Sequence, residues 1–300
     1  MSHCFRAEFL HCSRRDSTFC LAYASYHFIV IPKRLERALN SRELIANLTL
    51  RELRSKYRRS FLGWTWSLLN PLATVVLYSF VFGKLFGAVA PVGHPSGVRQ
   101  FGLYLLTGII PWGFFATVTS MSTNAILGNS GLVRKVAFPR QSLVIAQVLF
   151  MVVQSTIEVS LVAVILLIAG SPLLPWLPMT IMLLILLATF ALGISLGLSV
   201  LTVYFRDLPY LWTIVTQVWF FLTPIVYDYE SVKEKLGPIP RSIVSLNPLT
   251  VFVRSFRHTL YDGTHPNLAS IGLLALYSAL SLVVGSVVFR RLNRRLAEEA

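Results

Sequence analysis

Two ionisable residues stand in otherwise uncharged stretches of this 300-residue sequence, and they are the first candidates for chemistry. Glu158 interrupts one such stretch and Lys84 ends another. A charged side chain inside an apolar segment is costly in a membrane and is a functional candidate by default. Gln147, Gln154 and Glu158 follow at spacings of seven and four, so they share one face of a helix. We predict an ion pair between Lys84 and Glu158; the alternative is a carboxylate that is hydrogen-bonded inside a helix bundle.

Polar and aromatic side chains recur on the faces of three apolar segments. Such faces suit a conduit for sugars, because sugar rings stack on aromatic rings and sugar hydroxyls need hydrogen-bond partners. The same groups would equally serve as hydrogen bonds between helices and as interfacial aromatics, and both interpretations stay open. The predicted path residues are Tyr78, Phe82, Trp112, Phe115, Thr213, Thr216, Gln217 and Phe220.

The sequence has no residue set that is typical of a catalytic centre. A phosphate-binding loop needs Gly-x-x-x-x-Gly-Lys-Ser/Thr, whereas Gly83-Lys84 lacks the first glycine and is followed by leucine. The three cysteines, Cys4, Cys12 and Cys20, lack the close pairs of a zinc site. We therefore predict that this chain binds no metal or cofactor, hydrolyses no nucleotide and is not an enzyme.

The amino-acid composition is typical of a membrane protein. Hydrophobic residues make up 55% of the chain and charged residues only 13%, against about 25% charged residues in soluble domains. A net charge of +14 would suggest nucleic-acid binding in a soluble protein. Here the basic residues flank apolar runs, which favours a membrane and its anionic headgroups. We expect no nucleic-acid partner.

Uncharged runs predict an all-α membrane protein with six transmembrane helices. Each run is long enough to cross a hydrocarbon core of ~30 Å. With the N-terminus inside, most of the 27 lysines and arginines fall in cytoplasmic segments, so both termini are predicted to be cytoplasmic. The predicted spans are residues 68–89, 101–127, 142–169, 179–204, 208–227 and 268–289.

A basic amphipathic segment precedes the first span. Leu50, Leu53, Tyr57 and Phe61 recur at helical spacing, while arginines and a lysine occupy the other faces. Such a helix lies along the membrane surface; alternatively, the charges only orient the protein. The predicted domains are a cytoplasmic extension over residues 1–43, the interfacial helix over 44–67 and the transmembrane domain over 68–296.

Two further patterns concern packing. Gly193 with Gly197, and Ser281 with Gly285, are pairs of small residues that predict close helix contacts. Between the fifth and sixth spans, an amphipathic helix is predicted to lie in the outer headgroups. Its apolar positions are Leu249, Phe252, Val253, Phe256 and Leu260.

Short motifs follow one another from about Leu44 to Leu296. They are Arg51-Glu-Leu-Arg-Ser-Lys-Tyr57, Ser60, Leu62-Gly63, Trp66, Pro71, Arg134-Lys135 through Phe138-Pro139, Tyr204-Phe-Arg-Asp207, Thr223-Pro224 and Asn247-Pro248-Leu249-Thr250. Each motif alone is weak, but the ordered set on six spans resembles the transmembrane subunit of a type-2 ABC exporter. The similar proteins are of the polysaccharide-export kind, which moves O-antigen, teichoic acid, galactan or capsular glycans.

The resemblance implies a homodimer bound to two copies of a separate ABC ATPase, which would hold the ATP and Mg²⁺. It implies export of a polyprenyl-diphosphate-linked glycan across the cytoplasmic (inner) membrane. By the same resemblance, the ATPase contacts are Arg51, Arg54, Leu132, Val133, Arg134, Lys135 and Phe138. Because arginine matches phosphate geometry, the lipid diphosphate is expected at Arg54, Lys56, Arg58 and Arg59.

Three other functions stay open. One is a type-2 ABC exporter for a drug or a lipid. Another is a polyprenyl-phosphate glycosyltransferase, which needs acidic residues at the membrane face, where only Asp207 fits. The third is a passive channel, which needs no ATPase. Co-purification of an ATPase subunit would separate an exporter from the last two.

Overall fold

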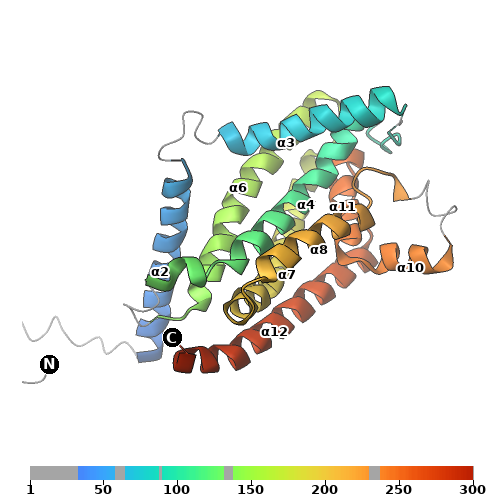
Figure 1. The fold of residues 1–300 in the computed structure, drawn as a ribbon. Helices are drawn as coiled ribbons and strands as arrows, with labels where there is room; N and C mark the ends of the chain where they lie inside the picture. The colour runs from blue at the N-terminus through green and yellow to red at the C-terminus, as the bar shows by residue number, and fades with distance from the viewer. Residues whose placement is uncertain (1–32, 58–64, 88–89, 132–137, 230–236, 300) are drawn as a thin grey trace, which may run out of the picture. The chain divides into compact units, whose positions relative to one another are not determined.

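The computed structural model is helical throughout the part of the chain that it describes, residues 33–57, 65–87, 90–131, 138–229 and 237–299 (Figure 1). No strand occurs in these ranges. The chain divides into two compact units, residues 1–42 and 43–300. All the contacts discussed below lie within the second unit.

The chain enters this unit through two helices. The first, α2 (Lys33–Tyr57), covers the first part of the predicted interfacial helix, and α3 (Thr65–Tyr78) begins before the predicted start of the first span. A π-helical segment, η1 (Ser79–Leu85), continues α3 directly. Gly87, with φ of 65°, then adopts the left-handed conformation that glycine tolerates best. The helix of the first span therefore ends four residues short of the predicted Val89.

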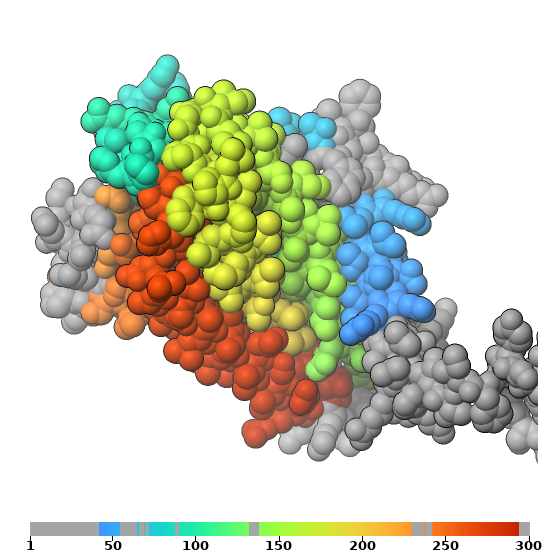
Figure 2. Space-filling view, turned by 180° about the vertical axis from the view of Figure 1, so that it is seen from behind, coloured from blue at the N-terminus to red at the C-terminus, as the bar shows by residue number. Residues whose placement is uncertain are grey.

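Four long apolar helices form the core of the unit: α4 (Phe101–Thr123), α6 (Gln141–Ile168), α7 (Leu177–Tyr204) and α12 (Leu268–Glu299). α7 contacts each of the other three, and Figure 2 shows α12 running beside it. Within the described ranges, four helices are long and apolar enough to cross a membrane. They correspond to the predicted second, third, fourth and sixth spans. The predicted first and fifth spans contain shorter apolar helices, Leu72–Leu85 and Leu208–Leu222.

The crossing of α7 and α12 depends on small residues. A Cβ atom at Gly193 would overlap the backbone of Ser281, and one at Gly285 would overlap the backbone of Gly193. By contrast, a Cβ at Gly197 would meet nothing within 4 Å. The predicted close contact is therefore confirmed for Gly193, Ser281 and Gly285, and Gly197 takes no part in it.

The predicted outer amphipathic helix is real, but its apolar face lies elsewhere than expected. It comprises α11 (Pro248–Arg257) and the π-helical η4 (His258–Asp262), preceded by α10 (Pro238–Leu246). All five predicted apolar positions are buried in the main hydrophobic cluster of the protein. This face packs against α4 and α7, so its apolar side chains are covered by protein and not by lipid headgroups as expected.

Candidate functional site

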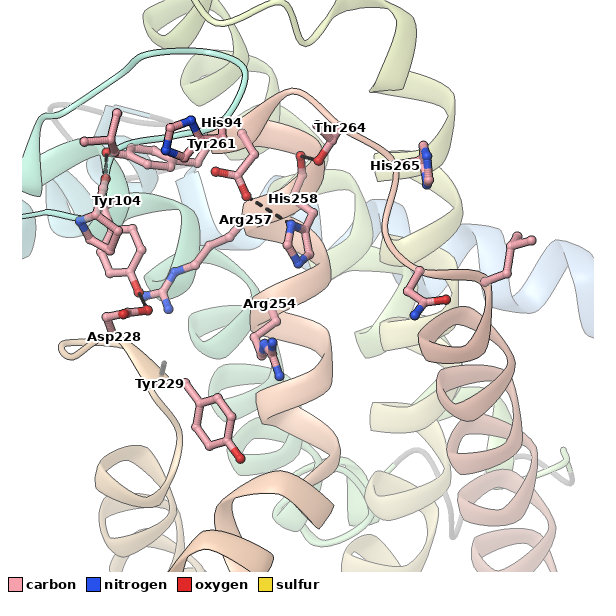
Figure 3. Close-up of a pocket in the computed structure, with 15 residues that line it drawn as sticks. His94, Tyr104, Asp228, Tyr229, Arg254, Arg257, His258, Tyr261, Thr264 and His265 are labelled. Carbon is pink, nitrogen blue, oxygen red and sulfur yellow. Dashed lines mark hydrogen bonds and ion pairs between the residues drawn. The ribbon is translucent and has the colours of Figure 1, made fainter. Parts of the chain in front are cut away.

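A cavity of about 740 Å³ lies beside α11 and η4, and we call it the α11 cavity (Figure 3). The loop before α4, the first turn of α4, the segment after α8 (Leu208–Leu222), α11, η4 and the start of α12 all contribute to its wall. Its ionisable groups include Arg254, Arg257, Asp228 and Asp262, together with three histidines. Charged groups of both signs thus face one concave space.

Arg257 is the most buried charge of the α11 cavity, with 6% of its surface exposed. Its Nη1 and Nη2 donate hydrogen bonds of 2.6 Å to the carbonyl oxygens of Pro224 and Ile225. Its guanidinium carbon lies 3.7 Å from the centre of the Tyr104 ring. Gly108 makes room for it, because a Cβ there would lie 3.0 Å from Nη2. Burial lowers the pKa of Arg257, whereas nearby Tyr104 and the aspartates act in the opposite direction; an arginine nevertheless stays charged.

Tyr261 fixes the loop before α4 to η4. Its hydroxyl lies 2.9 Å from the carbonyl oxygens of both Pro91 and Val98, and its ring meets Tyr104 edge to face at 5.5 Å. Burial raises the pKa of Tyr261 to about 12, and Asp262 adds to this effect. The hydroxyl therefore keeps its proton and remains a hydrogen-bond donor at neutral pH.

Two side-chain pairs complete the wall of the α11 cavity. The guanidinium carbon of Arg254 lies 5.0 Å from the centre of the Tyr229 ring, within cation–π range. One turn further on, Nδ1 of His258 is 3.0 Å from Oδ2 of Asp262. Figure 3 shows that Arg254, Arg257 and His258 project from one continuous helix, whereas Tyr229 comes from the segment after α8. Helical spacing from 254 to 262 accounts for their common direction.

Two of the sequence motifs, Thr223-Pro224 and Asn247-Pro248, meet at the start of α11. The side chain of Asn247 caps α11 by accepting a hydrogen bond of 3.1 Å from the Leu249 backbone N–H. The same oxygen accepts a 2.8 Å bond from Nε1 of Trp219, and the amide nitrogen donates to Thr223. Asn247 and Thr223 therefore join the end of α8 to the start of α11.

The predicted path residues divide into two groups. Trp112, Phe115 and Phe220 belong to a packed aromatic cluster between α4 and α8, with Trp112 and Phe220 ring centres 5.5 Å apart. Phe115 has no exposed surface. Phe115 stacks on Phe190 and is a core residue in this conformation. Its place on the path stays a prediction. Trp112, 8% exposed, is nearly as enclosed.

The second group lies on more open surfaces. Thr213 and Gln217 are exposed on α8, whereas Thr216 is buried and donates its hydroxyl to the Trp212 and Thr213 carbonyls. Tyr78 and Phe82 are half-buried and meet edge to face at 5.8 Å at the junction of α3 and η1. The structure therefore leaves Thr213 and Gln217 as the exposed polar positions of the predicted path.

The predicted ATPase-coupling residues are only partly described. Nη2 of Arg51 donates to Oδ1 of Asn129 at 2.8 Å, which joins α2 to the 3-10 turn η2 (Leu127–Asn129). Arg54 is exposed on α2. Phe138 packs against Leu48 of α2 and against α6. Leu132, Val133, Arg134 and Lys135, and the diphosphate candidates Arg58 and Arg59, lie outside the described residues, as does the side chain of Lys56.

Lys84 and Glu158, the two charges that the sequence predicts to pair, have separate surroundings in the described structure. Nε2 of Gln154 donates to Oε1 of Glu158 at 3.0 Å, so the predicted polar stripe of α6 does contain a hydrogen bond. Lys84 is exposed near the end of η1. In the described part of the chain, no hydrogen bond or ion pair joins Lys84 to Glu158. The partner of Glu158 that the structure does show is Gln154, one helical turn earlier on α6.

The ionisable residues of the α11 cavity were not predicted as a site. One signal was available: Arg257 follows Val253 by four residues, so a basic residue stands on the apolar face of an amphipathic helix. A charge at such a position must find internal partners. The partners, Pro224, Ile225 and Tyr104, are distant in the sequence and become evident only in the fold.

Comparisons with known proteins agree with the fold and the motifs. A family model described as "ABC-2 type transporter" matches residues 43–261. The O-antigen export system permease protein RfbA of Myxococcus xanthus is 30% identical over 259 residues, covering 86% of this chain and 95% of that protein. RfbA of Klebsiella pneumoniae is 28% identical over 257 residues, 85% of this chain and 94% of that protein. The polysialic acid transport protein KpsM of Escherichia coli is 25% identical over 247 residues, 81% of this chain and 91% of that protein. This chain therefore belongs to the ABC-2 type transporter family.

Proposed function

We propose that this chain is the membrane-spanning permease subunit of an ATP-driven exporter of the O-antigen or galactan class. Its cargo would be a polyprenyl-diphosphate-linked polysaccharide that crosses the cytoplasmic membrane. The observation that carries the proposal is the match to permeases named for O-antigen export, which extends over 85% or more of this chain. The chain itself would catalyse no reaction, and a separate ABC ATPase would bind ATP and Mg²⁺.

The proposed topology has six spans with both termini in the cytoplasm. α3 with η1, and α8 with the turn that follows it, would supply the two spans that are too short as single α-helices. The short α8 ends at Leu222, and Thr223, the next residue, accepts a hydrogen bond from Asn247 at the start of α11. In this orientation the α11 cavity opens on the outer side of the membrane.

The exposed face of α8 supports a homodimer. Thr213 and Gln217 share this face with the large side chains of Tyr210, Ile214 and Phe221, which are all more than half exposed. Polar groups that face lipid are unfavourable. A second copy of the chain would cover this surface, and the polar positions would then line a path between the two copies.

The inner end offers a route for energy coupling. The bond between Arg51 and Asn129 joins α2 to the chain just before the predicted docking loop. ATP-driven closure of the paired ATPases would move these docking elements, and the α3 and α8 spans of the two copies would part to admit the glycan. ATP can drive this change only if it binds the closed conformation of the ATPases more tightly than the open one.

The lipid diphosphate is proposed to bind at the basic face of α2. Arg54 is exposed there, and Lys56, Arg58 and Arg59 follow in the sequence. Arginine suits this task, because its planar donors match two phosphate oxygens at once.

Co-purification and genetic rescue test the proposed function together. Tagged chain should bring down an ATPase subunit with a phosphate-binding loop. In a host strain that lacks the chain, lipid-linked glycan should accumulate inside the cell, and the wild-type chain should restore surface glycan. A chain that purifies without an ATPase and transfers sugars by itself would be a glycosyltransferase instead.

A further inference from the structure

We propose that the α11 cavity is a glycan-binding subsite that holds one or two sugar units within a single copy of the chain. This inference rests on the proposed export function and adds an outer site that is separate from the path between copies. It concerns a stretch of the glycan that has already crossed the membrane. The cavity volume of about 740 Å³ is typical of small-molecule sites, which range over roughly 300–1,000 Å³.

The mixture of donors and acceptors favours a sugar over a simple anion. Every sugar hydroxyl both donates and accepts hydrogen bonds. The α11 cavity offers the carboxylates of Asp228 and Asp262 as acceptors and the guanidinium of Arg254 as a donor, and His258 and Asn267 supply further polar groups. The two arginines and the two aspartates balance in charge, so the α11 cavity does not select for an anion, whereas a polyol can use both kinds of group.

Rigid groups hold the inner wall of the α11 cavity in place. Arg257 is fixed by two carbonyl oxygens and by the Tyr104 ring. Its Nε is buried and has no hydrogen-bond partner among the described residues, although the residue lines the cavity. Preorganised walls of this kind reduce the entropy that binding costs.

The outer rim carries the groups that can adapt to a ligand. Arg254, packed over Tyr229, is half-buried, and the side chain of His258 is 45% exposed beside Asp262. These side chains can reach ligand hydroxyls without disturbing the inner wall. Arg254 and Asp262 are therefore the residues whose replacement should weaken glycan binding while the fold is retained.

The test uses the complete complex of this chain and its ATPase in lipid nanodiscs. The probe is lipid-free glycan, released from the polyprenyl carrier of the host cells by mild acid, and its Kd is measured by microscale thermophoresis. Arg254→Gln and Asp262→Asn should each raise the Kd about tenfold, the effect of losing one charge-assisted hydrogen bond. Arg99→Gln is the matched control, because Arg99 is exposed, lies in the loop before α4 and does not line the cavity.

The outcomes separate this inference from the proposed function. Wild type and Arg99→Gln should bind alike, and all variants should retain the ATPase and the wild-type Tm. An unchanged Kd in both cavity variants, in a complex that still exports glycan, would overturn the subsite and leave the export function intact. Displacement of the glycan by phosphatidylglycerol vesicles alone would overturn it in favour of a lipid site. If the wild-type complex exports no glycan, the proposed function itself fails.

Discussion

The guanidinium carbon of Arg257 lies 3.7 Å from the centre of the Tyr104 ring, while its nitrogens donate to the carbonyl oxygens of Pro224 and Ile225. This arrangement joins three segments: the start of α4, the turn after α8 and the end of α11. A buried arginine with such partners holds together segments that are far apart in the sequence.

Arg257→Lys should destabilise the protein by about 2 kcal/mol, because an ammonium group cannot reach both carbonyls with the fork geometry of a guanidinium. Tyr104→Phe keeps the ring and removes only a long hydrogen bond of 3.4 Å to Asp228. It should therefore have a much smaller effect. Thermal unfolding in detergent measures both, and equal Tm values for Arg257→Lys and wild type would refute the assigned role.

Gly193→Ala should separate α7 from α12 and lower the Tm by several degrees, because its Cβ would overlap the Ser281 backbone. Gly197→Ala is the matched control on the same helix. A Cβ at Gly197 has open space, and alanine is favoured over glycine in a helix by about 1 kcal/mol. Its Tm should stay the same or rise. The same loss of Tm in both variants would contradict the described crossing.

Tyr261 should make the stability depend on pH in the alkaline range. Its pKa is raised from 10.0 to about 12 in the folded protein. The folded state therefore holds the proton more tightly than the unfolded state, and this contribution is fully present below pH 10. It is lost as the pH rises towards 12. The Tm advantage of wild type over Tyr261→Phe should accordingly shrink between pH 10 and 12, and a constant difference would argue against the shifted pKa.

The hydrogen bond between Arg51 and Asn129 should give a measurable coupling energy between these two residues in a double-mutant cycle. In a double-mutant cycle on ATP-dependent export, Arg51→Ala and Asn129→Ala should each reduce export, and the double variant should lose little more than either single variant. Arg54→Ala with Asn129→Ala serves as the comparison, because Arg51 is the arginine that donates a hydrogen bond to Oδ1 of Asn129. Strictly additive effects for Arg51 and Asn129 would show that their contact carries no coupling.

The four long apolar helices were predictable because the thickness of the hydrocarbon core fixes the length of an apolar run. Which face of each helix packs inside the protein could not be predicted from the sequence. Lipid is as apolar as a protein core, so the residues of a span that pack inside resemble those that face lipid. Phe115 is buried for this reason although it was predicted to line a path, and Val164 on α6 is exposed.

Contacts between side chains were predicted best where the two residues are close together in the sequence. The stripe of Gln154 and Glu158 follows from helical spacing alone and is present. Pairing Lys84 with Glu158 relied on similar depth in two helices, and depth does not determine which faces meet. The surroundings of Arg257 depend on three segments converging in space, which no spacing rule on one segment can reveal.

Inverted membrane vesicles test the central claim of glycan export most directly. Their outer surface is the cytoplasmic face, so exported glycan should accumulate inside them. With this chain, its ATPase, ATP and lipid-linked glycan, we expect glycan that becomes protected from added glycosidase. Protection should be lost when ATP or this chain is omitted. Glycan that stays fully accessible to the enzyme in the complete system, although ATP is hydrolysed, would contradict the proposed export function.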